Sequence, residues 1–265
     1  MIDKKLFIHP LEESLLEELK NNTYFSEEII DNYKNYDEKM RRPDLFGKTV
    51  RVTMKQFPTV YKNACEVADI LEMELPEIFV YEDFYYGVES KGVSKPWIEI
   101  SAKTIFDFNE NELRFLIARE MFNIHMGHTY YDVLIDETLG VIQNGLRVMP
   151  TDVIVQSLKY SMYKWRRISN YSADCFGYVI CNDVRASIYC ILKMILNNHE
   201  LANNICLLDY IKQAETINEM NSPVESSTKL DEQMPYGPFR VKNIIAYASS
   251  NRGQQALKEL DNEKG

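Results

Sequence analysis

The sequence of 265 residues contains no long apolar run and no segment of the kind that forms a linker. No stretch approaches the roughly 18 to 20 apolar residues of a membrane-spanning helix. The first residues also lack the apolar core of a signal peptide. We therefore expect a protein with no membrane span that acts in the cytoplasm. Only 10 glycines and 9 prolines are spread along the chain, which argues against flexible linkers between domains.

Cysteine is scarce, and its spacing excludes two kinds of site. An odd number of cysteines without a C-x-x-C pair argues against a disulfide framework and against a cysteine-ligated zinc site. We expect the thiols to be free and buried. The five cysteines are Cys65, Cys175, Cys181, Cys190 and Cys206.

Basic residues are outnumbered by acidic ones, which gives a formal net charge of −10. An acidic chain repels phosphate backbones, so we expect no nucleic-acid partner. The one basic cluster, formed by Lys164, Arg166 and Arg167 around Trp165, is short. It is typical of a solvated helix face.

The spacing of apolar residues predicts a fold that is predominantly helical, with a small sheet, and therefore of the α+β class. Asn109 and Glu112 form the pattern of a capping box, so a helix is expected to begin there and to end near Gly127. Helical patterns cover residues 10–42, 57–73, 109–127, 130–160, 162–181, 184–197 and 239–260. Strand patterns cover residues 49–53, 77–81 and 97–101, and loops are expected at 85–94 and 221–238.

Two segments carry the clearest motifs. The first reads E-L-R-F at residues 112–115, then Arg119, Glu120 and Asn123, then G-H at 127–128; the second reads W-R-R-I-S-N-Y-S-A-D at 165–174. They resemble the CAAX prenyl protease and HtpX-like zinc metallopeptidases (peptidase family forty-eight, soluble bacterial branch). That family has E-L-R-F, H-E-x-x-H and G-H on one helix, followed by W-x-R-x-x-E-x-S-x-D.

The flanking sequence resembles the same family in the same order. F-I-H-P at 7–10, K-P-W-I at 95–98 and P-F-R at 238–240 look like family elements, so the resemblance covers nearly the whole chain. It implies a zincin-like fold with a small sheet beside the active-site helix. It also implies one peptidase-like domain over residues 1–265, with a core at about 45–200 and a C-terminal helical segment at about 201–265.

The zinc-ligand positions depart from the family. In the family two histidines and a glutamate bind zinc, and the glutamate of H-E-x-x-H is the general base. Here Arg119, Asn123 and Asn170 occupy the three ligand positions, and only the base position, Glu120, is kept. Arginine stays protonated and has no lone pair to donate, and an amide oxygen is a weak ligand. We expect no bound zinc, no other cofactor and no catalysis by Glu120.

A guanidinium in place of the metal is the hypothesis that follows. Arg119 is expected to pair with Glu120 or with Asp174, and Asp174 and His128 are expected to support the site from behind. At about 100° per residue, His125 and His128 point away from the helix face of Arg119, which argues against a relocated metal site.

The resemblance also implies that an extended peptide pairs with the strand beside the helix, here Trp97, Ile98, Glu99, Ile100 and Ser101. Backbone pairing needs no metal. The alternative is that the loop at 85–94 covers this strand, and the sequence leaves both open.

Three functions compete at this stage. The first is a catalytically inactive homologue that binds a peptide or protein, with a catalytic relative or a peptide substrate of one as its partner. The second is a zinc-dependent metalloendopeptidase with atypical ligands. The third is a structural or regulatory protein with a closed cleft.

Overall fold

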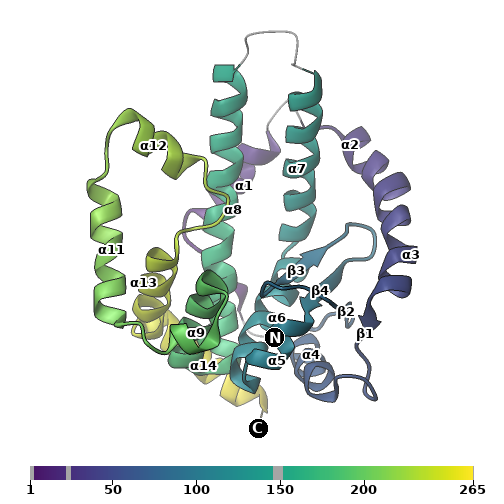
Figure 1. The fold of residues 1–265 in the computed structure, drawn as a ribbon, viewed down its shortest axis with the longest axis vertical. Coiled ribbons are helices and arrows are strands. Elements are labelled where there is room, and N and C mark those ends of the chain that lie inside the picture. The colour runs from purple at the N-terminus through teal and green to yellow at the C-terminus, as the bar shows by residue number, and fades with distance from the viewer. Residues whose placement is uncertain (1–2, 22–24, 146–151, 265) are drawn as a thin grey trace.

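The computed structural model describes residues 3–21, 25–145 and 152–264. Helices make up most of it, and a small sheet lies to one side (Figure 1). The α-helices of the first half are α1 (Glu12–Lys20), α2 (Glu27–Asn32), α3 (Glu38–Lys48), α4 (Pro58–Leu71), α5 (Ala102–Asp107), α6 (Glu110–His125) and α7 (His128–Gly145). Those of the second half are α8 (Asp152–Cys181), α9 (Val184–Leu196), α10 (His199–Ala202), α11 (Leu207–Glu219), α12 (Pro223–Leu230), α13 (Gly237–Ala248) and α14 (Asn251–Lys264).

Helix α6 is the central element. It begins at the predicted capping box, where Asn109 accepts a hydrogen bond from the Glu112 N–H at 3.0 Å and Glu112 accepts one from the Asn109 N–H at 2.8 Å. It ends just before Gly127, whose φ of +74° lets the chain turn directly into α7. Helices α4, α8 and α9 and the sheet surround α6, so most of its side chains are buried.

The sheet has four strands in the order β1-β2-β4-β3, with bounds β1 (Val50–Arg51), β2 (Glu77–Tyr81), β3 (Val88–Lys91) and β4 (Trp97–Ser101). Strand β4 runs parallel to β2 on one side and antiparallel to β3 on the other. All five residues of β4 are buried. The outer strand next to α6 is therefore β3.

This arrangement corrects the prediction that Trp97, Ile98, Glu99, Ile100 and Ser101 form a peptide-binding edge. Both sides of β4 are already paired within the chain, so no edge remains for a further strand. The covering strand, β3, lies inside the segment predicted to be a loop. Its polar V-E-S-K sequence has little strand preference, which is why the pattern did not show it.

Other differences are local. The segment at 221–238, predicted to be a loop, contains α12, which Ser222 caps, and the single C-terminal helix is two helices, α13 and α14. Helix α8 begins at Asp152, ten residues before the helix expected at 162–181, and both end at residue 181.

Three cysteines are buried as expected, but Cys65 is half-buried and Cys206 is exposed. In the part of the chain that the structure describes, no helix combines the length and apolar character needed to span a bilayer.

Gly177 sets the approach of α8 to α6. A Cβ added there would lie 2.8 Å from the Cγ of Arg119 and 2.9 Å from the carbonyl oxygen of Phe115. The missing side chain thus leaves room for the stem of Arg119.

Substitution of Gly177 tests this packing. We expect Gly177→Ala to lower the free energy of unfolding by about 1 to 3 kcal/mol, because the added methyl group overpacks the contact. Gly140→Ala is the matched control: it lies within α7 with no atom near its added Cβ, and should stabilise by up to about 1 kcal/mol. Urea unfolding measures both, and a Gly177→Ala protein as stable as the wild type would contradict this account of the packing.

Candidate functional site

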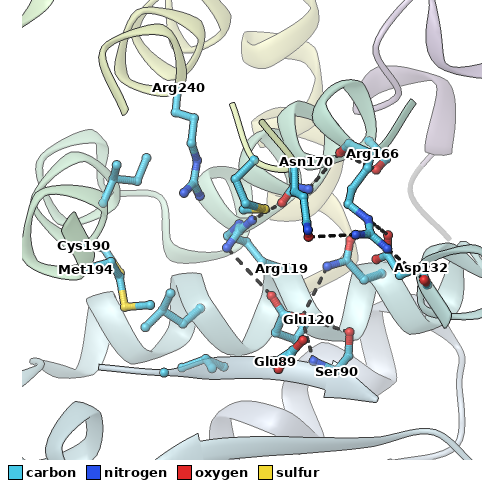
Figure 2. Close-up of a pocket in the computed structure, with 18 of the residues that line it drawn as sticks. Glu89, Ser90, Arg119, Glu120, Asp132, Arg166, Asn170, Cys190, Met194 and Arg240 are labelled. Carbon is cyan, nitrogen blue, oxygen red and sulfur yellow. Dashed lines mark hydrogen bonds and ion pairs between the residues drawn. The ribbon is translucent and has the colours of Figure 1, made fainter. Parts of the chain in front are cut away.

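The residues singled out from the sequence meet around one pocket of about 360 Å³, here called the α6 pocket. Residues 87–90, the inner parts of α6, α8 and α9, and residues of the chain after α12 line it. Arg119, Glu120 and Asn123 come from α6, and Asn170 comes from α8. Figure 2 shows Arg119 between Glu120 and Asn170.

Arg119 holds this cluster together. Its Nη2 donates to the Oδ1 of Asn170 at 2.9 Å, and its Nη1 lies 3.8 Å from the Oε1 of Glu120. Its Nε lies 2.7 Å from the Oδ1 of Asp174, a close ion pair that is not aligned as a hydrogen bond. The guanidinium therefore occupies the space between the base position and the two polar residues of α8, as the hypothesis of an Arg119–Asp174 or Arg119–Glu120 pair requires.

Asp174 lies beneath the pocket and is completely buried. It accepts two hydrogen bonds from Arg240 of α13, from Nε to Oδ2 at 2.8 Å and from Nη2 to Oδ1 at 2.7 Å. Two guanidiniums thus share one carboxylate. The sequence analysis picked out the P-F-R segment but did not predict the role of its arginine, Arg240. The signal was Asp174 itself, because a buried aspartate needs a cation nearby.

Glu120 is buried, and its main partner was not predicted from the sequence. The backbone N–H and the hydroxyl of Ser90 in β3 both donate to its Oε2 at 2.9 Å. The amide of Asn123 donates more weakly, at 3.4 Å. Burial raises the pKa of the Glu120 carboxyl, although Arg119 and Ser90 act in the opposite direction.

His128 contacts Asn123, which corrects the expectation that it points away from the helix face of Arg119; that it supports the site from behind stays a prediction. Its Nδ1 lies 3.2 Å from the Oδ1 of Asn123, and its Nε2 lies 2.7 Å from the Oε1 of Glu12 in α1. The prediction assumed one straight helix, whereas the chain turns at Gly127 and brings the first residue of α7 back. Burial favours a higher pKa for Glu12, but hydrogen bonds from His128 and Ser172 hold the pKa of this carboxyl below its ordinary value.

A second ion-pair cluster forms the opposite wall of the pocket. Arg166 donates from Nε to the Oδ1 of Asp132 at 2.7 Å and from Nη1 to the Oε1 of Gln233 at 2.9 Å. It also pairs with Asp136 at 2.9 Å. This member of the basic cluster noted in the sequence is buried and links α7 to α8, so it is not a solvated face.

The donor set around Arg119 does not suit zinc. Arg119 and Asn123 contact Glu120, and Asn170 contacts Arg119, so the predicted ligand positions hold a permanent cation and two amides. Among the residues that the structure describes, no group of three or more histidine, cysteine, aspartate or glutamate side chains is arranged to hold a metal ion. The absence of zinc from the protein itself stays a prediction.

Comparison with known proteins gives one distant similarity. No family model matches the chain, and no solved structure matches it. The chain is 21% identical over 184 residues to the plastoglobule-localized metallopeptidase 48, chloroplastic, of Arabidopsis thaliana, which covers 66% of this chain and 51% of that protein. The chain spans about half the length of this relative. The similarity supports a distant relationship to metallopeptidases and carries no information on activity.

The buried Glu120 predicts a pH dependence of stability. Its folded-state pKa is raised, so the folded protein binds the proton more tightly than the unfolded chain does. The free energy of unfolding therefore falls as the pH rises above the ordinary value of 4.5, until the raised pKa is passed. Glu120→Gln removes this contribution, so the variant should gain stability relative to the wild type as the pH rises above 4.5.

Urea unfolding at several pH values measures the difference. Glu89→Gln, which alters an exposed carboxylate at the rim of the same pocket, is the matched control and should keep the wild-type slope. A difference between wild type and Glu120→Gln that does not change with pH would show that Glu120 is not held in this way.

Proposed function

We propose that this protein is a metallopeptidase-like protein that has lost its zinc site and binds a peptide or protein segment without cleaving it. One observation carries the proposal: the Arg119 guanidinium lies in contact with Glu120, Asn170 and Asp174. The proposal takes residues 1–265 as one peptidase-like domain of zincin-like fold that acts in the cytoplasm without a cofactor. Its partner is a peptide, or a protein such as a catalytic relative.

Electrostatics argue against a metal beside Arg119. Two unit charges 4 Å apart interact by about 4 kcal/mol at an effective dielectric constant of 20, so a divalent cation at that distance would be repelled by about 8 kcal/mol. Asn123 and Asn170 offer only neutral amide oxygens in return. Without a metal-bound water, Glu120 has no nucleophile to activate, and its Oε2 instead accepts hydrogen bonds from Ser90.

The outer edge of β3 supports a binding role. The carbonyl of Gly87 accepts the Ser101 N–H at 2.9 Å, so the backbone groups of Gly87 face β4. Because these groups alternate along an antiparallel strand, those of Val88 and Ser90 face the pocket. The Ser90 N–H is already bonded to Glu120. Among the described residues, the N–H and carbonyl of Val88 and the carbonyl of Ser90 have no backbone partner, so they form an edge on which an extended peptide can pair.

Metal content tests the loss of the zinc site. We expect the purified wild type to contain well below 0.1 equivalent of zinc by plasma mass spectrometry, on the order of background, and to leave casein uncleaved. The triple variant Arg119→His, Asn123→His, Asn170→Glu restores a ligand set of two imidazoles and a carboxylate and should take up about one equivalent. One equivalent of tightly held zinc in the wild type would instead establish the alternative, a metalloendopeptidase with atypical ligands.

A proline at the open edge tests the binding role. Val88→Pro removes the N–H that faces the pocket but no hydrogen bond to β4, so β3 should stay in the sheet. We expect it to reduce capture of synthetic random decapeptides by at least about tenfold, which corresponds to the loss of about 1.4 kcal/mol. Val88→Ala keeps the N–H and is the matched control. Equal capture by Val88→Pro and the wild type would rule out pairing on β3.

A further inference from the structure

Two buried arginines in the α6 pocket share one carboxylate. Arg119 and Arg240 are only 6% and 9% exposed. The Nε of Arg119 and the Nη2 of Arg240 each lie 2.7 Å from the same atom, the Oδ1 of Asp174. These two nitrogen atoms are therefore within twice that distance of one another. Figure 2 shows the guanidinium of Arg240 reaching from its helix toward Arg119.

Both guanidiniums keep N–H groups that no acceptor uses. Within the ranges that the structure describes, the Nη1 of Arg240 has no hydrogen-bond partner. The Nη1 of Arg119 has only the Glu120 carboxylate, at 3.8 Å, which is too far for a hydrogen bond. By contrast, Arg166 in the same pocket bonds through Nε, Nη1 and Nη2. Neither Nη1 is among the fully buried atoms without a partner, so both are open to the pocket, where a ligand can supply an acceptor.

The charge balance favours an acceptor with one negative charge. Arg119 and Arg240 contribute two positive charges, and Asp174 neutralises one of them. The other carboxyl, Glu120, accepts its hydrogen bonds from Ser90 and forms none with either guanidinium. A carboxylate suits two guanidiniums, since its two oxygens can each accept from one of them.

The neighbouring wall of the pocket is apolar. Leu116 of α6 and Cys190, Ile191 and Met194 of α9 line it. Figure 2 shows Cys190 and Met194 on the side of the pocket away from Arg166 and Asp132. A ligand held at the arginines would therefore rest its next group against aliphatic and sulfur-containing side chains.

We propose that Arg119 and Arg240 together bind the carboxylate of a monocarboxylate ligand whose aliphatic group packs against Leu116, Ile191 and Met194. The inference rests on the proposed function, because it names the ligand chemistry of the same pocket. The carboxylate can belong to the C-terminal residue of a peptide or to a small free acid. These two sources are separated by experiment.

Isothermal titration calorimetry with three probes tests the proposal: the hexapeptide Ala-Ala-Ala-Ala-Ala-Leu, its C-terminal amide, and 4-methylpentanoate. We expect the free acid peptide to bind on the order of 30-fold more tightly than the amide, since only the acid gives the two arginines a charged acceptor. Arg240→Gln should abolish the preference, whereas Arg185→Gln, an exposed arginine at the start of α9, should retain it.

A second pair of variants tests the site while leaving both buried arginines unchanged. Both Met194→Glu and Met194→Lys remove an apolar contact, but only Met194→Glu places a negative charge beside the site, so it should weaken binding of the acid peptide more than Met194→Lys does. Circular dichroism and urea unfolding verify that both are folded. Equal effects of the two substitutions on the acid peptide would overturn the proposal.

The outcomes separate this inference from the proposed function. If acid and amide bind equally and Val88→Pro abolishes both, peptide binding stands and the carboxylate site is overturned. If 4-methylpentanoate binds and neither peptide does, the carboxylate site stands and the peptide-binding function is overturned. Tighter binding of inorganic phosphate than of 4-methylpentanoate would also overturn the proposal, and binding of no probe would overturn both.

Discussion

The buried carboxylate of Asp174 joins three helices that are far apart in the sequence. It lies on α8 and contacts Arg119 of α6 and Arg240 of α13. Removing one partner from a buried ion pair typically costs about 3 to 5 kcal/mol, because the remaining charge is left unpaired. The position of Arg119, and with it the identity of the pocket, therefore depends on this shared contact. Arg119 thereby contacts Glu120, Asn170 and Asp174 together.

In the function proposed here, the same contact links the loss of the zinc site to the gain of a binding surface. A guanidinium that lies where a metal ligand is expected offers N–H donors in place of a Lewis acid. Glu120 accepts two hydrogen bonds from Ser90, which fix β3 against α6. The edge of β3, the two arginines and the apolar wall of α9 then lie around one volume. The relationship to a known metallopeptidase is distant, so these functional conclusions depend on the side chains themselves.

Local patterns predicted the helices well and the sheet only in part. The capping box at Asn109 gives the start of α6 because it depends on neighbouring residues alone. Strand β3 could not be predicted, because its pairing with β4 comes from tertiary contact and its sequence is polar. Within the site, motif spacing predicted that Arg119 and Asp174 meet. It could not give Ser90 or Arg240, whose positions depend on how the sheet and α13 pack, and it misplaced His128 because a turn at Gly127 breaks the helical geometry.

The link from Glu12 to His128 has a consequence for the role of the N-terminal segment. Glu12 is buried, accepts a hydrogen bond from Ser172 and lies 2.7 Å from His128, which in turn contacts Asn123. The backbone N–H of His9 also donates to Ser172 at 2.8 Å. Truncation that removes the first helix would leave His128 and Ser172 without their carboxylate partner inside the molecule. The segment from His9 to Glu12 thus stabilises α6 through His128 and Asn123, and its loss would destabilise the position of α6 although the segment does not line the pocket.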